Sequence, residues 1–197
     1  GRFRDKAAGA KVLGPAVTKW TSAIQQGVNY ESEFRVRKAD GSYRWHYQTV
    51  PGETWDYTAT QHIMLADLDI EGRTRRVVMQ APKNGFFYAL DAGTGELISA
   101  GPYTPVNWAT GVDLESGRPV EVASARFDKT GQPAIVLPGP LGGHNWYPMA
   151  FSQRTNLVYI PVTENFMGYV ADNEFIVDPE GWNTGVDFGR GFQLVRS

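Results

Sequence analysis

The spacing of apolar positions along the chain changes after Gly27. Before it, the stretch AVTKWTSAIQQG places Val17, Trp20 and Ile24 on one side of a helix, with Gly27 suited to be its C-cap. After it, short apolar segments are bounded by Gly, Pro, Asn or Asp, as in strands joined by tight turns. The pattern predicts a short N-terminal helical segment, with residues 17–26 helical, and an all-β body without a further amphipathic helix.

A strand-and-turn pattern recurs along this body. Gly41 and Gly95 occupy the same place in the pattern and lie 54 residues apart, close to the length of one four-stranded blade of a β-propeller. A third turn followed by a strand begins at Arg154, 59 residues after Gly95. The recurrence predicts that residues 45–190 form antiparallel sheets, as two to three blades of a propeller.

Composition limits the classes of function. Of the 197 residues, 42% are hydrophobic and 20% are charged, which is enough apolar material for a packed core. The net charge of −2 gives no electrostatic basis for binding nucleic acid or an anionic membrane surface. No apolar run approaches the roughly 18 residues of a membrane span. Without Cys, the chain cannot form a disulfide, a thiolate metal site or a covalent haem attachment. Its start lacks Met and a signal-peptide core, which indicates an internal fragment.

The stretch PGETWDYTATQ contains the first candidate for chemistry, Asp56, between Trp55 and Tyr57. An Asp in such a place commonly bonds the local backbone of a turn while the rings pack inward. The alternative is a carboxylate held in a dry pocket, where limited solvation raises its basicity and lets it accept a proton. The residues themselves leave both interpretations open.

Two further stretches place polar residues among apolar ones. In APKNGFF, Lys83 precedes a buried strand, where its ammonium either meets a partner or snorkels to the surface. GGHNWYPM is a Gly-rich turn that presents Asn145 and Trp146, although an ordinary loop with a backbone-bonded Asn would have the same composition. The three histidines share no ligand spacing, so no His-based metal site is expected.

Taken in order from Trp45 to Phe188, four segments resemble the quinoprotein alcohol dehydrogenases. They are WHYQTVPGETWDYTATQHIMLADLDI, VVMQAPKNGFFYALDAGTGELISA, PVNWATGVDLESGRPV and PGPLGGHNWYPMAFSQRTNLVYIPVTENF. The resemblance implies an eight-bladed propeller that carries pyrroloquinoline quinone (PQQ) and a metal ion on its axis. It also implies a periplasmic enzyme that oxidises a small alcohol by hydride transfer to the quinone, with a cytochrome or other electron acceptor for the full-length protein.

The resemblance assigns roles to particular residues. Asp56 falls on the family's catalytic aspartate, which takes the alcohol proton and ligates or lies beside the metal. Lys83 falls on the cation that contacts the quinone oxygens, and Asn145 and Trp146 fall on further residues that contact PQQ. Lanthanide-dependent relatives carry a second Asp two residues after the catalytic one. Thr58 stands there in this chain, which favours Ca²⁺.

Other parts of the family's site have no counterpart in this chain. The remaining metal ligands, the Trp beneath the quinone and a vicinal disulfide lie upstream of the resemblance, so the fragment alone is expected to be inactive. The family allows a haem c in a downstream part of the full-length protein, outside this chain. A non-catalytic propeller of the same repeat class, used for assembly or binding, is the alternative, although it has no need of WDY, APKNG and HNW together.

Residues 1–44 depart from the family pattern. Residues 17–46 instead resemble the end of a PAS-type sensor domain. We therefore divide the chain into residues 1–44, a helix followed by strands that is PAS-like or chimeric, and residues 45–197, a partial PQQ-type propeller. A diverged propeller blade is the alternative for the first part, whereas a sensory module would leave most of the chain unexplained.

Overall fold

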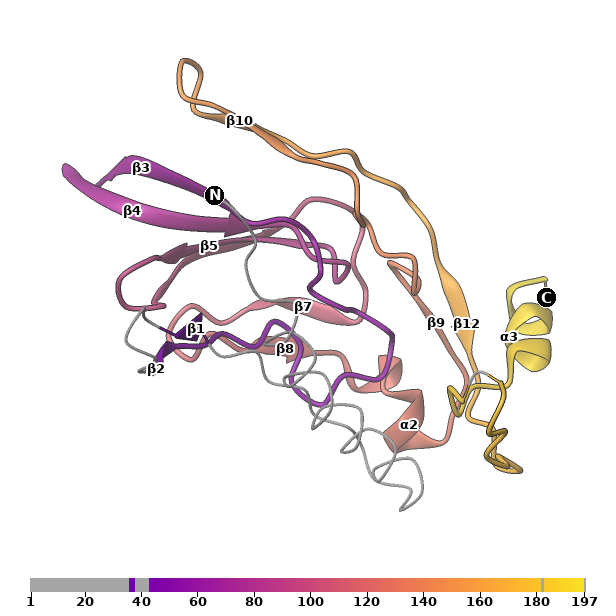
Figure 1. Ribbon diagram of the computed structural model, residues 1–197. Helices are drawn as coiled ribbons and strands as arrows, with labels where there is room; N and C mark the ends of the chain where they lie inside the picture. Colours follow the sequence, from indigo (N-terminus) through magenta and orange to yellow (C-terminus); the bar gives the residue numbers. More distant parts are fainter. Residues whose placement is uncertain (1–35, 38–42, 182, 197) are drawn as a thin grey trace.

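Antiparallel strands make up the body of the chain (Figure 1). The computed structural model describes residues 36–37, 43–181 and 183–196. Every pair of strands in this part of the chain is antiparallel, which confirms the predicted all-β class. The helix predicted at residues 17–26 and the turn at Gly41 lie outside the described residues.

One four-stranded sheet forms a complete meander. Its strands, in order, are β3 (Met64–Ile70), β4 (Arg73–Gln80), β5 (Phe86–Asp91) and β6 (Leu97–Pro102). Neighbours in sequence are neighbours in the sheet, as in one propeller blade. Asp91 fixes the last turn, since its Oδ1 accepts the backbone N–H groups of Gly93 and Thr94 at 2.8 and 2.9 Å.

The other described strands form two-stranded pairs. These are β1 (Val36–Arg37) with β2 (Tyr43–Trp45), β7 (Ala109–Val112) with β8 (Pro119–Glu121), β9 (Ala134–Val136) with β12 (Met167–Tyr169), and β10 (Ala150–Ser152) with β11 (Leu157–Tyr159). The hairpin of β10 and β11 runs alongside the four-stranded sheet (Figure 1), and its Phe151 and Val158 pack against the buried side chains of β3, β4 and β5. The described residues thus contain one full four-stranded sheet and several incomplete ones.

The expectation that the body has no further amphipathic helix is wrong at α3 (Phe188–Arg196). The two glycines of this segment lower its helix propensity, so the sequence does not favour a helix there. The structure explains Gly191: a Cβ atom there would lie 2.2 Å from the backbone oxygen of Gly168 in β12, so a glycine is needed for α3 to approach the strand this closely. Two shorter helical turns, η1 (Ala123–Ala125) and α2 (Phe127–Thr130), follow β8.

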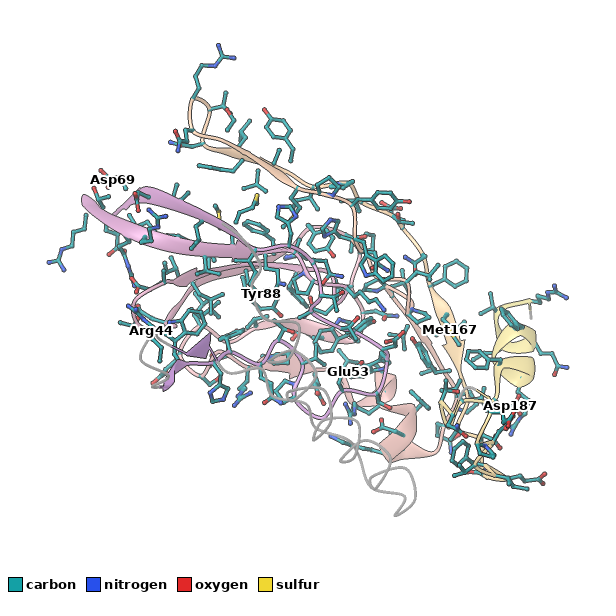
Figure 2. All side chains as sticks on the ribbon, viewed as in Figure 1. Arg44, Glu53, Asp69, Tyr88, Met167 and Asp187 are labelled. Atoms are coloured by element: carbon teal, nitrogen blue, oxygen red, sulfur yellow. The ribbon has the colours of Figure 1, made fainter. Side chains whose placement is uncertain are left out.

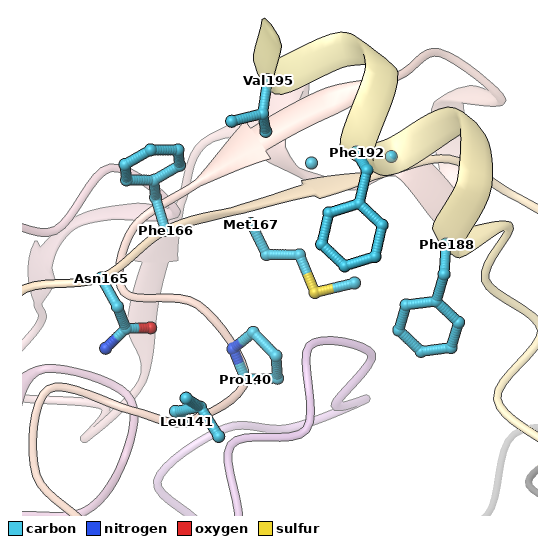
Figure 3. Close-up of a pocket in the computed structure, with 10 residues that line it drawn as sticks. Pro140, Leu141, Asn165, Phe166, Met167, Phe188, Phe192 and Val195 are labelled. Carbon is cyan, nitrogen blue, oxygen red and sulfur yellow. The ribbon is translucent and has the colours of Figure 1, made fainter.

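An apolar cavity of about 240 Å³ lies beside α3 (Figure 3). Phe188, Phe192 and Val195 line it from the helix, at the spacing of one helical face. Phe166 and Met167 line it from the start of β12. None of the helices among the described residues is long and apolar enough to cross a membrane.

Aromatic side chains form the main core. Trp55, Tyr57, Phe86 and Trp108 are buried, and Trp108 has its ring centroid between 5.1 and 5.9 Å from those of the other three. Tilted and edge-on rings at these distances add to the free energy gained from burying apolar area. Figure 2 shows Asp69 at the outer tip of the β3–β4 hairpin, so the other, open end of that hairpin is the one nearer the packed body.

Candidate active site

Asp56 projects from a turn whose neighbouring residues point inward. Trp55 and Tyr57 are 0% and 2% exposed, whereas the side chain of Asp56 is 63% exposed. The backbone of Asp56 has a φ of 67°, in the left-handed region that few residue types adopt readily. The expectation that the two rings limit the solvation of Asp56 is therefore wrong, because the rings pack in the core and leave the carboxylate outside it.

The acid that lies against this core is Glu53, which no sequence pattern marks. Its Oε1 accepts the N–H of Trp55 at 2.6 Å and the N–H of Tyr57 at 2.8 Å, so it binds the residues on both sides of Asp56. Burial raises the pKa of Glu53 above its ordinary value, and the two N–H groups offset part of that rise. An acid three positions before an Asp is too common in proteins to be a signal by itself.

Arg126 supports the same turn from the core side. Its Nη1 donates to the backbone oxygen of Gly52 at 2.7 Å, and its guanidinium carbon lies 4.8 Å from the centre of the Trp55 ring. The side chain is buried but paired, because Nη2 donates to Asp128 at 2.7 Å. Because a carboxylate and an aromatic ring hold this guanidinium in place, its bond to Gly52 keeps the turn fixed against the core.

Lys83 reaches Asp56 from the connection between β4 and β5. It is only 8% exposed, and its Nζ donates to the backbone oxygen of Asp56 at 3.1 Å and to Oδ2 of the same residue at 3.3 Å. The alternative of a lysine that snorkels to the surface is therefore wrong. Two residues that are 27 positions apart in the chain form one ion pair.

The Gly-rich loop that follows β9 packs directly on Lys83. The N–H of Gly143 donates to the backbone oxygen of Lys83 at 3.1 Å. A Cβ atom on Gly142 would lie 2.5 Å from Cγ of Lys83, so the loop and the lysine are in close contact. His144 secures the loop, because each of its ring nitrogens lies 2.7 Å from a backbone oxygen.

Asn145 and Trp146 belong to the same loop. Asn145 donates through Nδ2 to the backbone oxygen of Leu141 at 2.9 Å, while its Oδ1 is buried and has no hydrogen-bond partner within the described part of the chain. Trp146 is 82% exposed. The structure thus brings Asp56 and Lys83 into contact and places Asn145 and Trp146 in the loop that rests on Lys83. An unpartnered oxygen and an open indole are groups that a bound molecule could engage.

Few oxygen donors for a metal ion lie around Asp56 and Lys83. Among the residues that the structure describes, no three or more His, Cys, Asp or Glu side chains come together where they could hold an ion. Asp56 could offer its exposed carboxylate, and Thr58 is exposed as well. A hard cation such as Ca²⁺ takes six to eight oxygens, so it would need ligands beyond these.

Comparison with known proteins identifies the propeller. Residues 32–112 match the PQQ family model described as the glucose/ethanol/alcohol dehydrogenase β-propeller domain. Residues 32–112 thus resemble a segment of this propeller family. The chain is 48% identical over 153 residues to the quinohemoprotein alcohol dehydrogenase ADH IIB of Pseudomonas putida, a match that covers 78% of the chain and 22% of that protein. The chain thus spans about a fifth of the length of the curated relatives it matches.

Solved structures confirm the propeller class. The chain matches the crystal structure of the quinohemoprotein alcohol dehydrogenase from Comamonas testosteroni with a TM-score of 0.73 and 39% identity, over 85% of this chain and 27% of that one. It also matches a europium-containing methanol dehydrogenase with a TM-score of 0.67 and 34% identity, over 75% of this chain and 27% of that one. The resemblance to the quinoprotein alcohol dehydrogenases is thereby confirmed.

Proposed function

We propose that this chain forms one wall of the active site of a PQQ-dependent dehydrogenase that oxidises alcohols, with Asp56 as the general base. The observation that carries the proposal is the contact between Asp56 and Lys83, in which a buried ammonium meets an exposed carboxylate on a left-handed turn. The relatives whose names describe alcohol dehydrogenases support the reaction class. A base is useful because alcohols lose a proton poorly near neutral pH.

The residues around Lys83 fit a flat, anionic quinone. The buried ammonium of Lys83 would stabilise negative charge on the quinone oxygens. The unpartnered Oδ1 of Asn145 could accept a hydrogen bond from the cofactor, and the exposed indole of Trp146 offers an aromatic face. PQQ, when bound, would supply the acceptor for the hydride of the alcohol. Lys83, Asn145 and Trp146 would hold and orient it.

Asp56 is suited to accept the proton of a substrate hydroxyl. Nζ of Lys83 binds both Oδ2 and the backbone oxygen of Asp56, which fixes the direction of the side chain. The second carboxylate oxygen, Oδ1, is left for the substrate. A base with a fixed direction and open access on one side meets the geometric needs of general-base catalysis.

The remaining parts of the proposal follow the relatives. We propose Ca²⁺ as the metal, with Asp56 as one ligand, because Thr58 adds no second negative charge. We also propose a small alcohol as substrate, a cytochrome or other electron acceptor, a periplasmic location, and a haem c elsewhere in the full-length protein. The two relatives named as quinohemoproteins support the haem. Residues 1–44 would form a separate N-terminal part, and residues 45–197 the partial propeller.

Replacement of Asp56 by Asn tests the base. Asn keeps the size of the side chain and one of its oxygens but cannot take up the proton. In the full-length protein loaded with PQQ and Ca²⁺, we expect alcohol-dependent dye reduction to slow by roughly 10²–10⁴-fold. Asp67→Asn is the matched control, because Asp67 is an exposed carboxylate on β3 whose ion pair is with the exposed Arg76. Wild-type turnover by Asp56→Asn with the cofactor bound would show that Asp56 is a turn residue, and would favour the non-catalytic propeller.

A further inference from the structure

The left-handed backbone of Asp56 needs a cause, and the structure offers one in Glu53. We propose that Glu53 is the positioning residue of this site, holding Asp56 in the conformation in which Lys83 meets both its backbone oxygen and its carboxylate. The inference rests on the proposed function of Asp56 as the base. Glu53 itself would touch neither substrate nor cofactor.

The N–H groups of Trp55 and Tyr57 converge on one carboxylate oxygen. Oε1 of Glu53 lies 2.6 Å from the first nitrogen and 2.8 Å from the second. Alternate N–H groups point to one place when the backbone between them takes a left-handed conformation, an arrangement called an anion-binding nest. Asp56 is the residue between them, with a φ of 67°. Glu53 is therefore an internal anion for this nest.

Other contacts of the turn hold the neighbours of Asp56 without using these two N–H groups. The hydroxyl of Tyr169 donates to the backbone oxygen of Trp55 at 2.8 Å, and the hydroxyl of Tyr57 donates to the backbone oxygen of Pro138. The first acts on the peptide group between Trp55 and Asp56, and the second anchors the ring of Tyr57 in the core. A non-glycine residue keeps a left-handed backbone where its surroundings over-determine it. The N–H of Tyr57 belongs to the peptide group that follows Asp56, and the N–H of Trp55 to the peptide group that precedes Trp55. One oxygen of Glu53 therefore ties together the backbone on the two sides of Asp56.

The conformation of Asp56 also decides what Lys83 can reach. The ammonium contacts the backbone oxygen of Asp56 at 3.1 Å and its Oδ2 at 3.3 Å. A change in φ at Asp56 would rotate its side chain and its carbonyl group together relative to the preceding peptide, so both contacts with Lys83 would be lost. Glu53 is close enough to feel the charges of both Lys83 and Asp56. The three residues form one cluster, with Glu53 on its core side.

Two substitutions separate the hydrogen bonds of Glu53 from its charge. Glu53→Gln removes the charge but keeps an oxygen of the same reach, which can accept both N–H groups. Glu53→Asp keeps the charge but shortens the side chain by one methylene, so that one oxygen no longer reaches both groups. If Glu53 positions Asp56 through its two hydrogen bonds, Glu53→Gln should be tolerated and Glu53→Asp should not. A role for the negative charge predicts the reverse order.

We would measure steady-state kinetics in the full-length protein loaded with PQQ and Ca²⁺. We expect kcat of Glu53→Gln to stay within about threefold of wild type and kcat of Glu53→Asp to fall by about 10–100-fold, the scale of loss when a reacting group is displaced by roughly 1 Å. KM for the alcohol and the affinity for PQQ should change by less than about threefold, because the groups that would hold them remain. A second readout needs no turnover: crystal structures of the full-length variants should show a left-handed Asp56 in Glu53→Gln and its loss in Glu53→Asp.

Asp91→Ala is the matched control for loss of a turn. Asp91 also accepts two backbone N–H groups through one oxygen, but it is the last residue of β5, at the opposite end of that strand from Lys83. The Asp91→Ala substitution should lower the melting temperature of the protein and leave kcat unchanged. Wild-type kcat and a left-handed Asp56 in Glu53→Asp would overturn the positioning role, and so would an equal loss in Glu53→Gln. Failure of the proposed base is a different result, in which Asp56→Asn itself keeps wild-type turnover.

Discussion

The indole of Trp45 lies directly against Gly95. A Cβ atom on Gly95 would be 2.7 Å from Cδ2 of Trp45, and Nε1 of the indole donates to the backbone oxygen of Ala92 at 3.1 Å. Gly95 has a φ of 79°, in the turn that joins β5 to β6. The contact therefore ties β2 to the four-stranded sheet, across 50 residues of sequence between Trp45 and Gly95.

Gly95→Ala should destabilise the chain through this contact. The new methyl group would overlap the ring of Trp45 and also hold a non-glycine residue at positive φ. Overpacking and left-handed strain together predict a loss of roughly 2–5 kcal/mol in the free energy of unfolding. Gly72→Ala is the control, since Gly72 has a φ of 75° but open space around its Cα; strain alone predicts a loss of roughly 1–2 kcal/mol there. Equal losses in urea unfolding of the two variants would mean that the ring contact contributes nothing.

Lys83→Met should weaken the binding of PQQ. Methionine keeps an unbranched side chain against Gly142 but removes the ammonium that we propose to meet the quinone oxygens. Loss of one hydrogen bond to a charged group costs about 1.5–3 kcal/mol, so affinity should fall roughly 10–100-fold. The measurement is a titration of the full-length apoprotein with PQQ, followed by tryptophan fluorescence.

Lys129→Met serves as the control for this titration. Its side chain is 64% exposed, and its nearest acid, Glu121, is 3.9 Å away, so its loss should leave the affinity for PQQ unchanged. If Lys83→Met binds PQQ as tightly as wild type, Lys83 does not hold the cofactor, even if Asp56 remains the base.

The meeting of Asp56 and Lys83 follows from topology that the sequence does indicate. Asp56 precedes β3 and Lys83 follows β4, and a tight turn at Gly72 joins these two strands. An antiparallel hairpin returns the chain to the end at which it started, where Met64 pairs with Met79. Residues just outside the two strands must then lie near each other. The sequence analysis assigned both residues to one site only through the family resemblance, and the hairpin gives the physical reason why they meet.

The detailed geometry of the site could not be predicted in the same way. Hydropathy gives no backbone dihedral, so the left-handed Asp56 and its exposure were not foreseen, and the dry-pocket interpretation was wrong. Glu53 escaped notice because its partners are backbone N–H groups, which have no sequence signature. In α3, Gly191 lowers helix propensity, yet its lack of a side chain is what permits contact with β12. Tertiary contact outweighed local propensity there.

Buried tyrosines should make the chain sensitive to alkaline pH. Burial raises the pKa of Tyr47 to about 12, with Arg118 offsetting part of the rise, and burial also raises the pKa of Tyr57, Tyr88 and Tyr169. Each folded pKa lies above the unfolded value of about 10. Stability from the neutral phenols is therefore complete below about pH 10 and is lost as pH rises through the folded values, because the unfolded state ionises first.

The measurement is an alkaline titration of the chain. The part of the tyrosinate absorbance near 295 nm that comes from the buried phenols should rise together with the loss of far-UV circular dichroism, in one cooperative step above about pH 10, since these phenols ionise when the fold opens. Complete ionisation of all nine tyrosines with unchanged circular dichroism would contradict the burial argument.

The residue at position 58 should set the charge preference of the metal site in the full-length protein. Thr58 is exposed and neutral, two positions after Asp56. With one acid fewer than a site that carries Asp there, the site should favour a divalent over a trivalent ion, because the attraction grows with the product of the charges. Ca²⁺ should support turnover, and La³⁺ should add little.

Thr58→Asp should shift that preference toward La³⁺ by at least about tenfold in the ratio of the two activation constants, or about 1.4 kcal/mol. Thr60→Asp is the matched control: Thr60 is also exposed, and the substitution adds the same charge four positions from Asp56 rather than two. Dye reduction would be measured after reconstitution with PQQ and either ion. If both variants shift the preference equally, the effect is long-range charge rather than ligation at position 58. If neither shifts it, Thr58 does not face the metal, and the choice of Ca²⁺ over a lanthanide must lie in ligands from another part of the protein.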